Sequence, residues 1–528
     1  VRSMVIGALG TVVITTSSMF IALKLSSLPW PIIFVALVSM FCLKAMGNTN
    51  LREINVAQTA MSAGAMVAGG IAFTIPGIWM LNPDADISVG KLLIMTMSGV
   101  VLGLIFTALI RKFYIEDSSD MSFPMGEACA ETLTAGDKGG RKAGALFTTM
   151  GVVAVFTFLR DWFARIPATL LNRKMMAYGS YCGVYVSPML VGIGYIIGPA
   201  AIFVWFAGAI IGDFGILLGG TEFGLWDVMT AGQIKQSLGI GLMVGTGVGI
   251  ILFGIIPRAK EMFGGMFRKE SLDTAVIPVR WAPFAMIIIA FLGTAVLKMG
   301  VISSILVILG TWVATAMSAQ CVGQTGINPM EIFGILVLLL CKACTGIEGT
   351  EAFFAAAVVA VACGLCGDIM NDFKAGRILD TDPKAQWISE CVGSIIGGGV
   401  SVGVLMIIIA AYGGDCFGSE TFPAAQAAAV AAMVGGIPNM PAFIIGLVAA
   451  VLLYKLKVPV MTLGLGVYLP FYMSATAFIG GLLRFITDRL CPAFEEKGTG
   501  TIIASGLLGG EGITGVIIAL IVAVQAVV

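Results

Sequence analysis

Charged and amide side chains gather where a long apolar run of the sequence ends. Residues 352 to 367 carry no charge, and Asp368, Asn371, Asp372 and Lys374 follow directly. On a helix, Asp368 and Asp372 would share one face because they are four residues apart. Two carboxylates on one face can bind a proton or another cation, whereas the simpler interpretation is a helix end at the cytoplasmic surface. The sequence leaves both interpretations open.

Five further carboxylates stand in mostly apolar surroundings, away from the basic loops. Glu127 and Glu131 are four residues apart, Glu331 follows the stretch GINPM, Glu390 lies within SECVGS, and Glu511 is flanked by glycines. A carboxyl group buried away from water favours its neutral form, so it can take up and release a proton. We expect proton-binding roles for these residues; the alternatives are interhelical ion pairs and surface positions.

Amide and phenol side chains could complete a polar site beside these carboxylates. The candidates are Gln58, Gln324, Asn328, Gln386, Tyr195 and Tyr468. Gln324 and Asn328 shortly precede Glu331. The two tyrosines fall at similar places in two related segments, although tyrosine also anchors helices at membrane interfaces.

The composition indicates that these residues belong to a membrane protein. The chain has 528 residues, of which 58% are hydrophobic and only 11% charged. Crossing a bilayer takes about 20 apolar residues, and such runs recur about fifteen times without the strict alternation of a membrane barrel. We therefore expect an all-α polytopic integral membrane protein of about 14 to 16 transmembrane helices. Thirty basic and thirty acidic residues cancel, which gives no hint of nucleic-acid binding.

Basic residues cluster in four segments, at 137–144, 160–176, 257–280 and 374–384. Because cytoplasmic loops carry an excess of Lys and Arg, we assign these segments to the cytoplasmic side. In 160–176, basic and apolar residues alternate at helical spacing, which predicts an interfacial helix.

The sequence argues against a resident metal or cofactor. None of its 528 residues is histidine, the commonest metal ligand. It has eleven cysteines. The pairs at 341–344 and 363–366 have the CxxC spacing of zinc ligands. Both pairs lie at the ends of apolar runs rather than on polar turns, so we expect these cysteines to be small packing residues.

Paired segments in the same order in both halves predict an internal duplication. The matching pairs are 241–251 with 506–518, 187–199 with 458–470, 57–64 with 385–393, and the Phe-Pro steps at 123 and 422. We expect a first repeat at 1–256, a cytoplasmic loop at 257–280 and a second repeat at 281–528. Whether the copies are parallel or inverted stays open.

Gly and Pro interrupt several apolar segments. The stretches 120–136 and 420–436 are too short and too polar to span a membrane, and 318–334 is broken by Gly323, Gly326 and Pro329. We expect re-entrant half-helices in all three. Duplicated halves with broken helices are the usual build of secondary transporters.

Several of these stretches together resemble the oligopeptide transporter family. They are INVAQTAMSAG, FPMGEACAETL, SPMLVGIGYIIGP, GDIMNDFKAG with AQWISECVG, and ASGLLGGEGITGV, in the family's order from about residue 2 to 527. The chain is similar to a compact prokaryotic member, related to the yellow-stripe-like metal-chelate carriers. The resemblance implies proton-coupled symport of small peptides or peptide-like substrates, with metal-chelate complexes as the alternative, across a prokaryotic inner membrane, and it allows a homodimer.

For a zwitterionic peptide, a carboxylate would bind the amino end and half-helix N-termini would bind the carboxyl end.

Two other classes of membrane protein, proteases and channels, are remote alternatives. The GLCGD stretch superficially resembles the loop of intramembrane aspartyl proteases, but it lacks an upstream Tyr-Asp partner. A passive channel would favour a single ring of like residues, whereas the polar groups here are dispersed.

Overall fold

The structure is a computed structural model of the chain. It describes residues 2–25, 28, 31–117, 121–138, 140–249, 252–253, 256–257, 281–326, 328–419, 422, 424–435, 437–492, 494 and 498–527. The expected cytoplasmic loop at 257–280 lies outside these residues apart from its first position.

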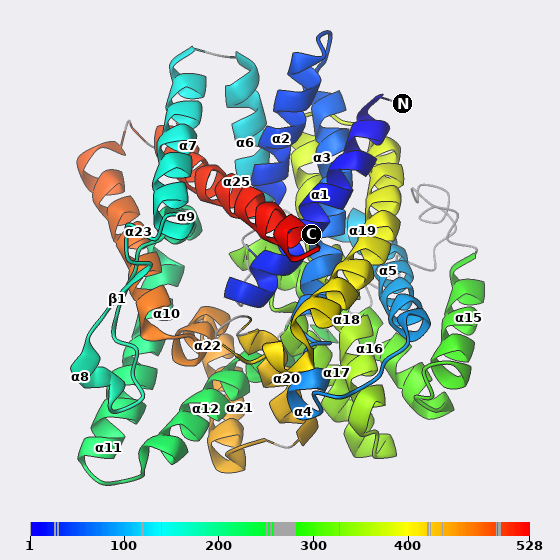
Figure 1. Cartoon of the computed structure of the whole chain (residues 1–528), viewed down its shortest axis with the longest axis vertical. Helices are drawn as coiled ribbons and strands as arrows, with labels where there is room; N and C mark the ends of the chain where they lie inside the picture. The colour runs from blue at the N-terminus through cyan, green and yellow to red at the C-terminus, as the bar shows by residue number, and fades with distance from the viewer. Residues whose placement is uncertain are drawn as a thin grey trace. The chain divides into compact units, whose positions relative to one another are not determined.

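The described chain is almost entirely helical, which confirms the all-α class (Figure 1). It divides into two compact units, each built from segments of both halves of the sequence. Unit 1 comprises residues 1–134, 258–436 and 519–528, and unit 2 comprises residues 135–257 and 437–518. These units cut the chain differently from the repeat boundaries expected from the sequence, which stay a prediction.

Unit 1 holds the first six helices and the helices that follow the central loop. They are α1 (Arg2–Leu25), α2 (Pro31–Ala45), α3 (Leu51–Ala72), α4 (Gly77–Leu81), α5 (Val89–Arg111), η1 (Lys112–Asp117), most of α6 (Pro124–Lys138), α15 (Ala282–Ala295), α16 (Val301–Thr325), α17 (Met330–Thr345), α18 (Gly349–Ile378), α19 (Pro383–Tyr412), η5 (Gly414–Cys416) and α20 (Ala425–Gly435).

Unit 2 holds the remaining helices and one strand pair. They are α7 (Gly140–Asp161), β1 (Thr169–Leu171), α8 (Arg173–Met176), β2 (Gly183–Tyr185), α9 (Pro188–Ile197), α10 (Pro199–Ala209), η2 (Ile210–Gly219), α11 (Gly220–Glu222), α12 (Val228–Gly249), α21 (Met440–Lys455), α22 (Val460–Tyr468), α23 (Phe471–Leu490) and most of α25 (Thr499–Val527).

Eight helical stretches among the described residues are long and apolar enough to cross a membrane, or nine if one bent pair counts as a span. The longest uninterrupted ones are α18 and α19, with 30 residues each. Pro and Gly break other apolar segments into shorter helices, such as the ten residues of α9 and the nine of α22. The expected count of 14 to 16 includes such short helices and stays a prediction.

Close packing through glycine brings α18 against α3 and α5 in unit 1. Gly70 of α3 lies against the backbone of Val361, and Gly103 of α5 lies against that of Ala362. Small residues allow helix backbones to approach this closely in membranes. Helix α18 is therefore buried on all sides from Ala352 to Phe373, and any charge in this stretch must be accommodated inside the protein.

Unit 1 contains two sets of helices that make the same contacts. In order, α1, α2, α3 and α5 of the first set correspond to α16, α17, α18 and α19 of the second. Helix α3 packs against α1, α2 and α19, and α18 packs against α16, α17 and α5. The corresponding helices α3 and α18 run antiparallel, because Gln58 bonds Asp372 and Ser62 bonds Asp368. This unit is thus built as an inverted repeat. The sequence pairing of 57–64 with 385–393, which would match α3 with α19, is wrong.

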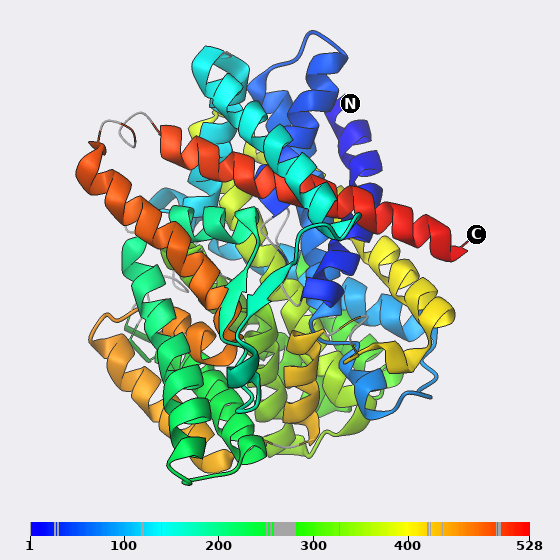
Figure 2. The same cartoon turned by 60° about the vertical axis from the view of Figure 1, so that its left-hand side comes forward.

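Unit 2 also contains two corresponding sets of helices. In order, α7, α9, α10 and α12 correspond to α21, α22, α23 and α25. Helix α9 packs on α23 as α10 packs on α22, and α12 packs on α21. The counterpart of the last contact joins α25 to α7, where Gly506 lies against Leu146 and Gly510 against Met150 (Figure 2).

The interfacial helix predicted at 160–176 is wrong. After α7 ends, β1 pairs antiparallel with β2, with Thr169 opposite Tyr185 (Figure 2). Thr476 of α23 accepts a hydrogen bond from the Tyr185 backbone N–H and donates one to its carbonyl. Thr476 thus provides hydrogen-bond partners for backbone groups at the edge of β2. The spacing of side chains in 160–176 contains no information about this contact with a distant helix.

Two of the three expected half-helices are short helices, and the third is a turn. Helices α6 and α20 have 15 and 11 residues, as their length and polarity predict. The stretch 318–334 instead contains the end of α16, which is 25 residues long, a left-handed Gly326 that ends it, and the start of α17. The glycine and proline mark a connection between two helices there.

Candidate functional site

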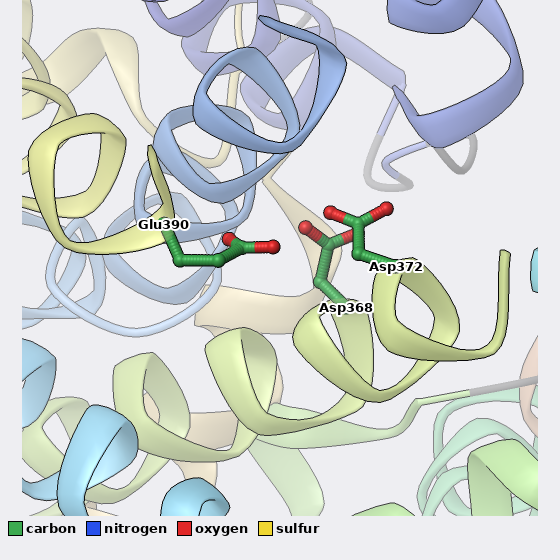
Figure 3. Close-up of side chains that lie close together, drawn as sticks. All are labelled: Asp368, Asp372 and Glu390. Carbon is green, nitrogen blue, oxygen red and sulfur yellow. The ribbon is translucent and has the colours of Figure 1, made fainter. Parts of the chain in front are cut away.

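Three buried carboxyl groups meet in unit 1. Asp368 and Asp372 project from one face of α18, and Glu390 of α19 points toward them (Figure 3). One oxygen from each group lies within 4.8 Å of the others, and all three side chains have an exposed fraction of 0%. We call Asp368, Asp372 and Glu390 the carboxylate triad.

The triad is incompletely hydrogen-bonded. Ser62 donates to Asp368 Oδ1 at 2.8 Å, and Gln58 Nε2 donates to Asp372 Oδ1 at 2.6 Å. The second oxygen of each aspartate and both oxygens of Glu390 accept no hydrogen bond from an N–H or O–H of another residue type, while the carboxyl groups of Asp372 and Glu390 are close enough to share a proton in a hydrogen bond. Buried carboxylates normally have partners, so four unpartnered oxygens in one place indicate a site for protons or a hard cation.

An amide network lies on one side of the triad. Asn55 Nδ2 donates to Gln58 Oε1 at 2.9 Å, and Gln386 Nε2 lies 3.0 Å from Asn55 Oδ1 and 2.8 Å from the Asp372 carbonyl. All three amide side chains are buried. Gly376 makes room for this network, because a Cβ there would strike the Gln386 amide.

A half-exposed ion pair involves Lys374, two residues after Asp372 on α18. Lys374 Nζ is 3.2 Å from Glu127 Oε1, and their side chains are 22% and 45% exposed. Asn371 Oδ1 accepts a hydrogen bond from the Gly126 N–H at 3.2 Å, in the first turn of α6. Helix α6 is thereby attached to the same part of α18 that carries the triad, and its thiol Cys129 is close enough to interact electrostatically with both aspartates.

Other predicted residues of unit 1 lie elsewhere or play structural roles. Glu131 is exposed, so its expected burial is wrong; Glu331 is buried in the first turn of α17. Asn328 donates to the Cys363 carbonyl at 2.8 Å and accepts from Ser318, which ties the turn after α16 to α18. The side chain of Gln324 lies outside the described residues.

The remaining candidates belong to unit 2. Glu511 is buried; it accepts hydrogen bonds from Arg160 Nη2 at 3.0 Å, Ser187 and the Met189 N–H at the start of α9. This is the interhelical ion pair that the sequence left open as an alternative. Tyr195 is buried and its hydroxyl lies 3.0 Å from Thr487 Oγ1.

Tyr468, the last candidate, is partly buried and packs against Gly239 of α12. The expectation that it lines a substrate path together with Tyr195 stays a prediction.

Two residues of the site were missed by the sequence analysis, Asn55 and Ser62. Both lie on α3 at helical spacing from Gln58, three residues before it and four after it. A polar stripe at 55, 58 and 62 on an otherwise apolar helix was the available signal. Their ordinary residue types concealed it.

The cysteine pairs do not form a four-thiolate cluster. Cys341, Cys363 and Cys366 are buried and Cys344 is exposed, and all four are free thiols. Among the described residues, the group whose side chains could together hold an ion is the carboxylate triad.

The comparisons with known proteins agree with this architecture. The family model described as OPT oligopeptide transporter protein matches residues 1–522. The chain belongs to the OPT family. It is similar to an oligopeptide transporter of Haemophilus influenzae, with 26% identity over 96% of this chain and 92% of that protein.

Plant proteins named as metal-nicotianamine transporters match over shorter segments. The metal-nicotianamine transporter YSL13 of Oryza sativa subsp. japonica is 24% identical over 37% of this chain and 30% of its own length. The metal-nicotianamine transporter YSL5 of Arabidopsis thaliana is 26% identical over 28% of this chain and 23% of its own length. With its apolar helices, the chain is an integral membrane protein of a transporter family.

Proposed function

We propose that the chain is a symporter that moves small peptide-like substrates together with protons, and that the carboxylate triad binds the protons. The observation that carries this proposal is the set of four unpartnered, buried carboxylate oxygens. A carrier needs a site whose charge changes with the coupling ion, and such groups inside a membrane are rare unless they are functional.

Electrostatics require the triad to take up positive charge. At a separation of 4.8 Å, two negative charges repel by about 3.5 kcal/mol at an effective dielectric constant of ~20. Three pairs of this kind cannot all stay ionised in a buried site, as in carboxylate dyads that share a proton. The donors Gln58 and Ser62 are neutral, so they cannot compensate the charge.

The half-exposed pair of Glu127 and Lys374 suits the two ends of a peptide. A carboxylate binds an ammonium group, and a lysine binds a carboxylate. The pair is accessible, in contrast to the triad. A zwitterionic ligand could replace the internal ion pair by two external ones without leaving either charge unpaired.

The two sites are linked through α18. Asn371 and Lys374 bind α6, while the adjacent Asp372 belongs to the triad. A change in the charge of the triad therefore acts on a helix segment that also holds the proposed substrate residues. This short connection is the basis on which proton binding and substrate binding would be coupled.

Metal-chelate complexes are the second candidate substrate. The observation that favours them is the similarity to plant proteins named as metal-nicotianamine transporters. Nicotianamine complexes also present carboxylate groups, so the same lysine would contact them.

The test is uptake of labelled di- to tetrapeptides and of an iron–nicotianamine complex into proteoliposomes, with an inward proton gradient, a sodium gradient or none. Asp368→Asn removes one charge of the triad, and Glu348→Gln, an exposed carboxylate at the start of the same helix, is the matched control. We expect proton-stimulated uptake in the wild type and control, and its loss in Asp368→Asn. Uptake that responds to sodium instead, or to neither gradient, would refute proton coupling.

A further inference from the structure

An open cavity lies at the start of α3 and the start of α19 in unit 1. Its volume is about 410 Å³, and its walls include Arg52, Glu53, Asp380 and Asp382. Arg52 and Asp380 form an ion pair whose side chains are 60% and 85% exposed, so this side of the cavity opens to water.

The floor of the cavity borders the amide network. Val56 and Ala385 line the cavity, and their neighbours in sequence, Asn55 and Gln386, are fully buried polar residues. The hydrogen bond of 3.0 Å between these two amides closes the floor.

From this floor, hydrogen bonds continue without interruption to the triad. Asn55 donates to Gln58, and Gln58 donates to Asp372 Oδ1. In the opposite direction, α18 is buried and uncharged from Ala352 to Gly367. Within the described residues, this chain of hydrogen bonds runs from the triad to Asn55 and Gln386, next in sequence to Val56 and Ala385 of the cavity wall.

We propose that this cavity is the aqueous mouth through which the triad exchanges protons, and that Asn55, Gln58 and Gln386 form the gate between them. This inference rests on the proposed function. Neutral amides donate and accept hydrogen bonds but hold no charge at neutral pH. In the closed network they separate water from the carboxylates, and rotation of the amides would admit water to Asp372.

The charges around the path suit a proton route. At the cavity, Glu53 is paired with Arg2 and Asp380 with Arg52, so the carboxylate of Asp382 is the one that adds net negative charge and attracts cations. Among the described residues, the thiols of Cys129 and Cys391 are the titratable side chains that interact with the triad, and Lys374 lies two residues beyond Asp372.

The distribution of basic residues indicates on which side of the membrane the cavity opens. Lys374, Arg377 and Lys384 belong to the basic segment 374–384, which covers the end of α18 and the start of α19 and which the excess of positive charge assigns to the cytoplasm. The cavity would then release protons into the cytoplasm after the substrate has crossed.

The first experiment blocks the cavity. Ala385→Cys places a thiol on its wall, and Lys384→Cys, exposed and outside the cavity walls, is the matched control. Both are labelled in detergent with a cationic methanethiosulfonate and then reconstituted. Labelled wild type corrects for native thiols such as exposed Cys344 and Cys491, while burial raises the pKa of the Cys182 thiol and slows its reaction.

We expect labelled Ala385→Cys to lose proton-driven uptake, to recover it after reduction, and to keep exchange of labelled for unlabelled substrate at acidic pH. Uptake unaffected by labelling would overturn the proposal. Loss of exchange as well would also overturn it, since the cavity would then admit substrate. If unlabelled wild type shows no proton-driven uptake, the proposed function itself fails, which keeps the two failures distinct.

A second variant tests the gate without touching the cavity. Gly376→Ala is compatible with a helix, but its methyl group would displace the Gln386 amide. We expect proton flux into vesicles to rise in the absence of substrate, measured with an internal pH dye. Flux identical to the wild type would overturn the role of the amides as a gate.

Discussion

Replacing Glu390 by glutamine tests whether the triad acts as one proton-binding unit. The substitution keeps the shape of the side chain and removes a charge whose two oxygens accept no hydrogen bond. It eliminates two of the three repulsive pairs. Each ionised pair repels by at least about 3.5 kcal/mol at an effective dielectric constant of ~20, because 4.8 Å is the largest separation of the oxygens.

With Glu390 neutral, Asp368 and Asp372 lose protons more readily, so loading them takes a higher proton concentration. Because 1.4 kcal/mol corresponds to a tenfold change in an equilibrium constant, the repulsion of one ionised pair corresponds to about a few hundred-fold. The three carboxyl groups titrate together and share this effect, so we expect a change of roughly ten- to a hundred-fold.

The assay is the external proton concentration that gives half-maximal substrate uptake in proteoliposomes. Glu348→Gln removes an exposed carboxylate from α18 and controls for the change in total charge; it should stay within about twofold of the wild type because exposed charges interact weakly. A half-maximal proton concentration in Glu390→Gln within the same twofold range would refute the reasoning that the three carboxyl groups interact.

Three further variants test the packing and the second charged site. Arg160→Met leaves buried Glu511 without its cation, so we expect thermal unfolding in detergent at a clearly lower temperature, for a loss of about 3–5 kcal/mol; an unchanged midpoint would contradict the structural role of this pair. Gly126→Ala forces a methyl group against the Asn371 backbone, which should lower stability by about 1–3 kcal/mol and reduce uptake in the same assay. Lys374→Met removes the half-exposed ammonium; we expect KM for peptides to rise roughly tenfold, the equivalent of one ion pair, and an unchanged KM would exclude this lysine from the substrate site.

The sequence predicted the centre of the site because residue types that are rare in membranes stand out there. Asp368 and Asp372 share a helix face as their spacing requires, and Gln58, Gln386 and Glu390 lie with them. Each interrupts an apolar segment, so its type alone marked it. The sequence left open whether the two aspartates form a cation- or proton-binding pair or simply mark a helix end at the surface. Their burial decides against a surface position, because both side chains have an exposed fraction of 0%.

Burial of carboxylates on shorter helices could not be predicted in the same way. Glu127 and Glu131 were expected at depth, yet the first is half-exposed and the second exposed. Helix α6 has a polar face as well as an apolar one, and only its neighbours decide which face meets solvent. Glu511 is buried as expected, but its arginine partner is 351 positions away, a pairing that no local pattern contains.

The inverted repeat shows that the two aspartates of the triad have no carboxylate counterparts in the first copy of unit 1. Aligning Phe123 with Phe422 pairs Asp368 with Gly69 and Asp372 with Phe73. The two copies therefore share a helix frame in which α3 and α18 cross, but only the second copy carries carboxylates at the crossing.

The first copy supplies neutral donors instead, from Gln58 and Ser62. Such a division keeps the number of buried charges low, because each additional charge in the membrane costs about 2.5–3.5 kcal/mol. It also lets one copy change its charge while the other provides fixed hydrogen-bond donors. Proton binding would then act on the contact between α3 and α18, the pair of helices around which the two copies of unit 1 are related.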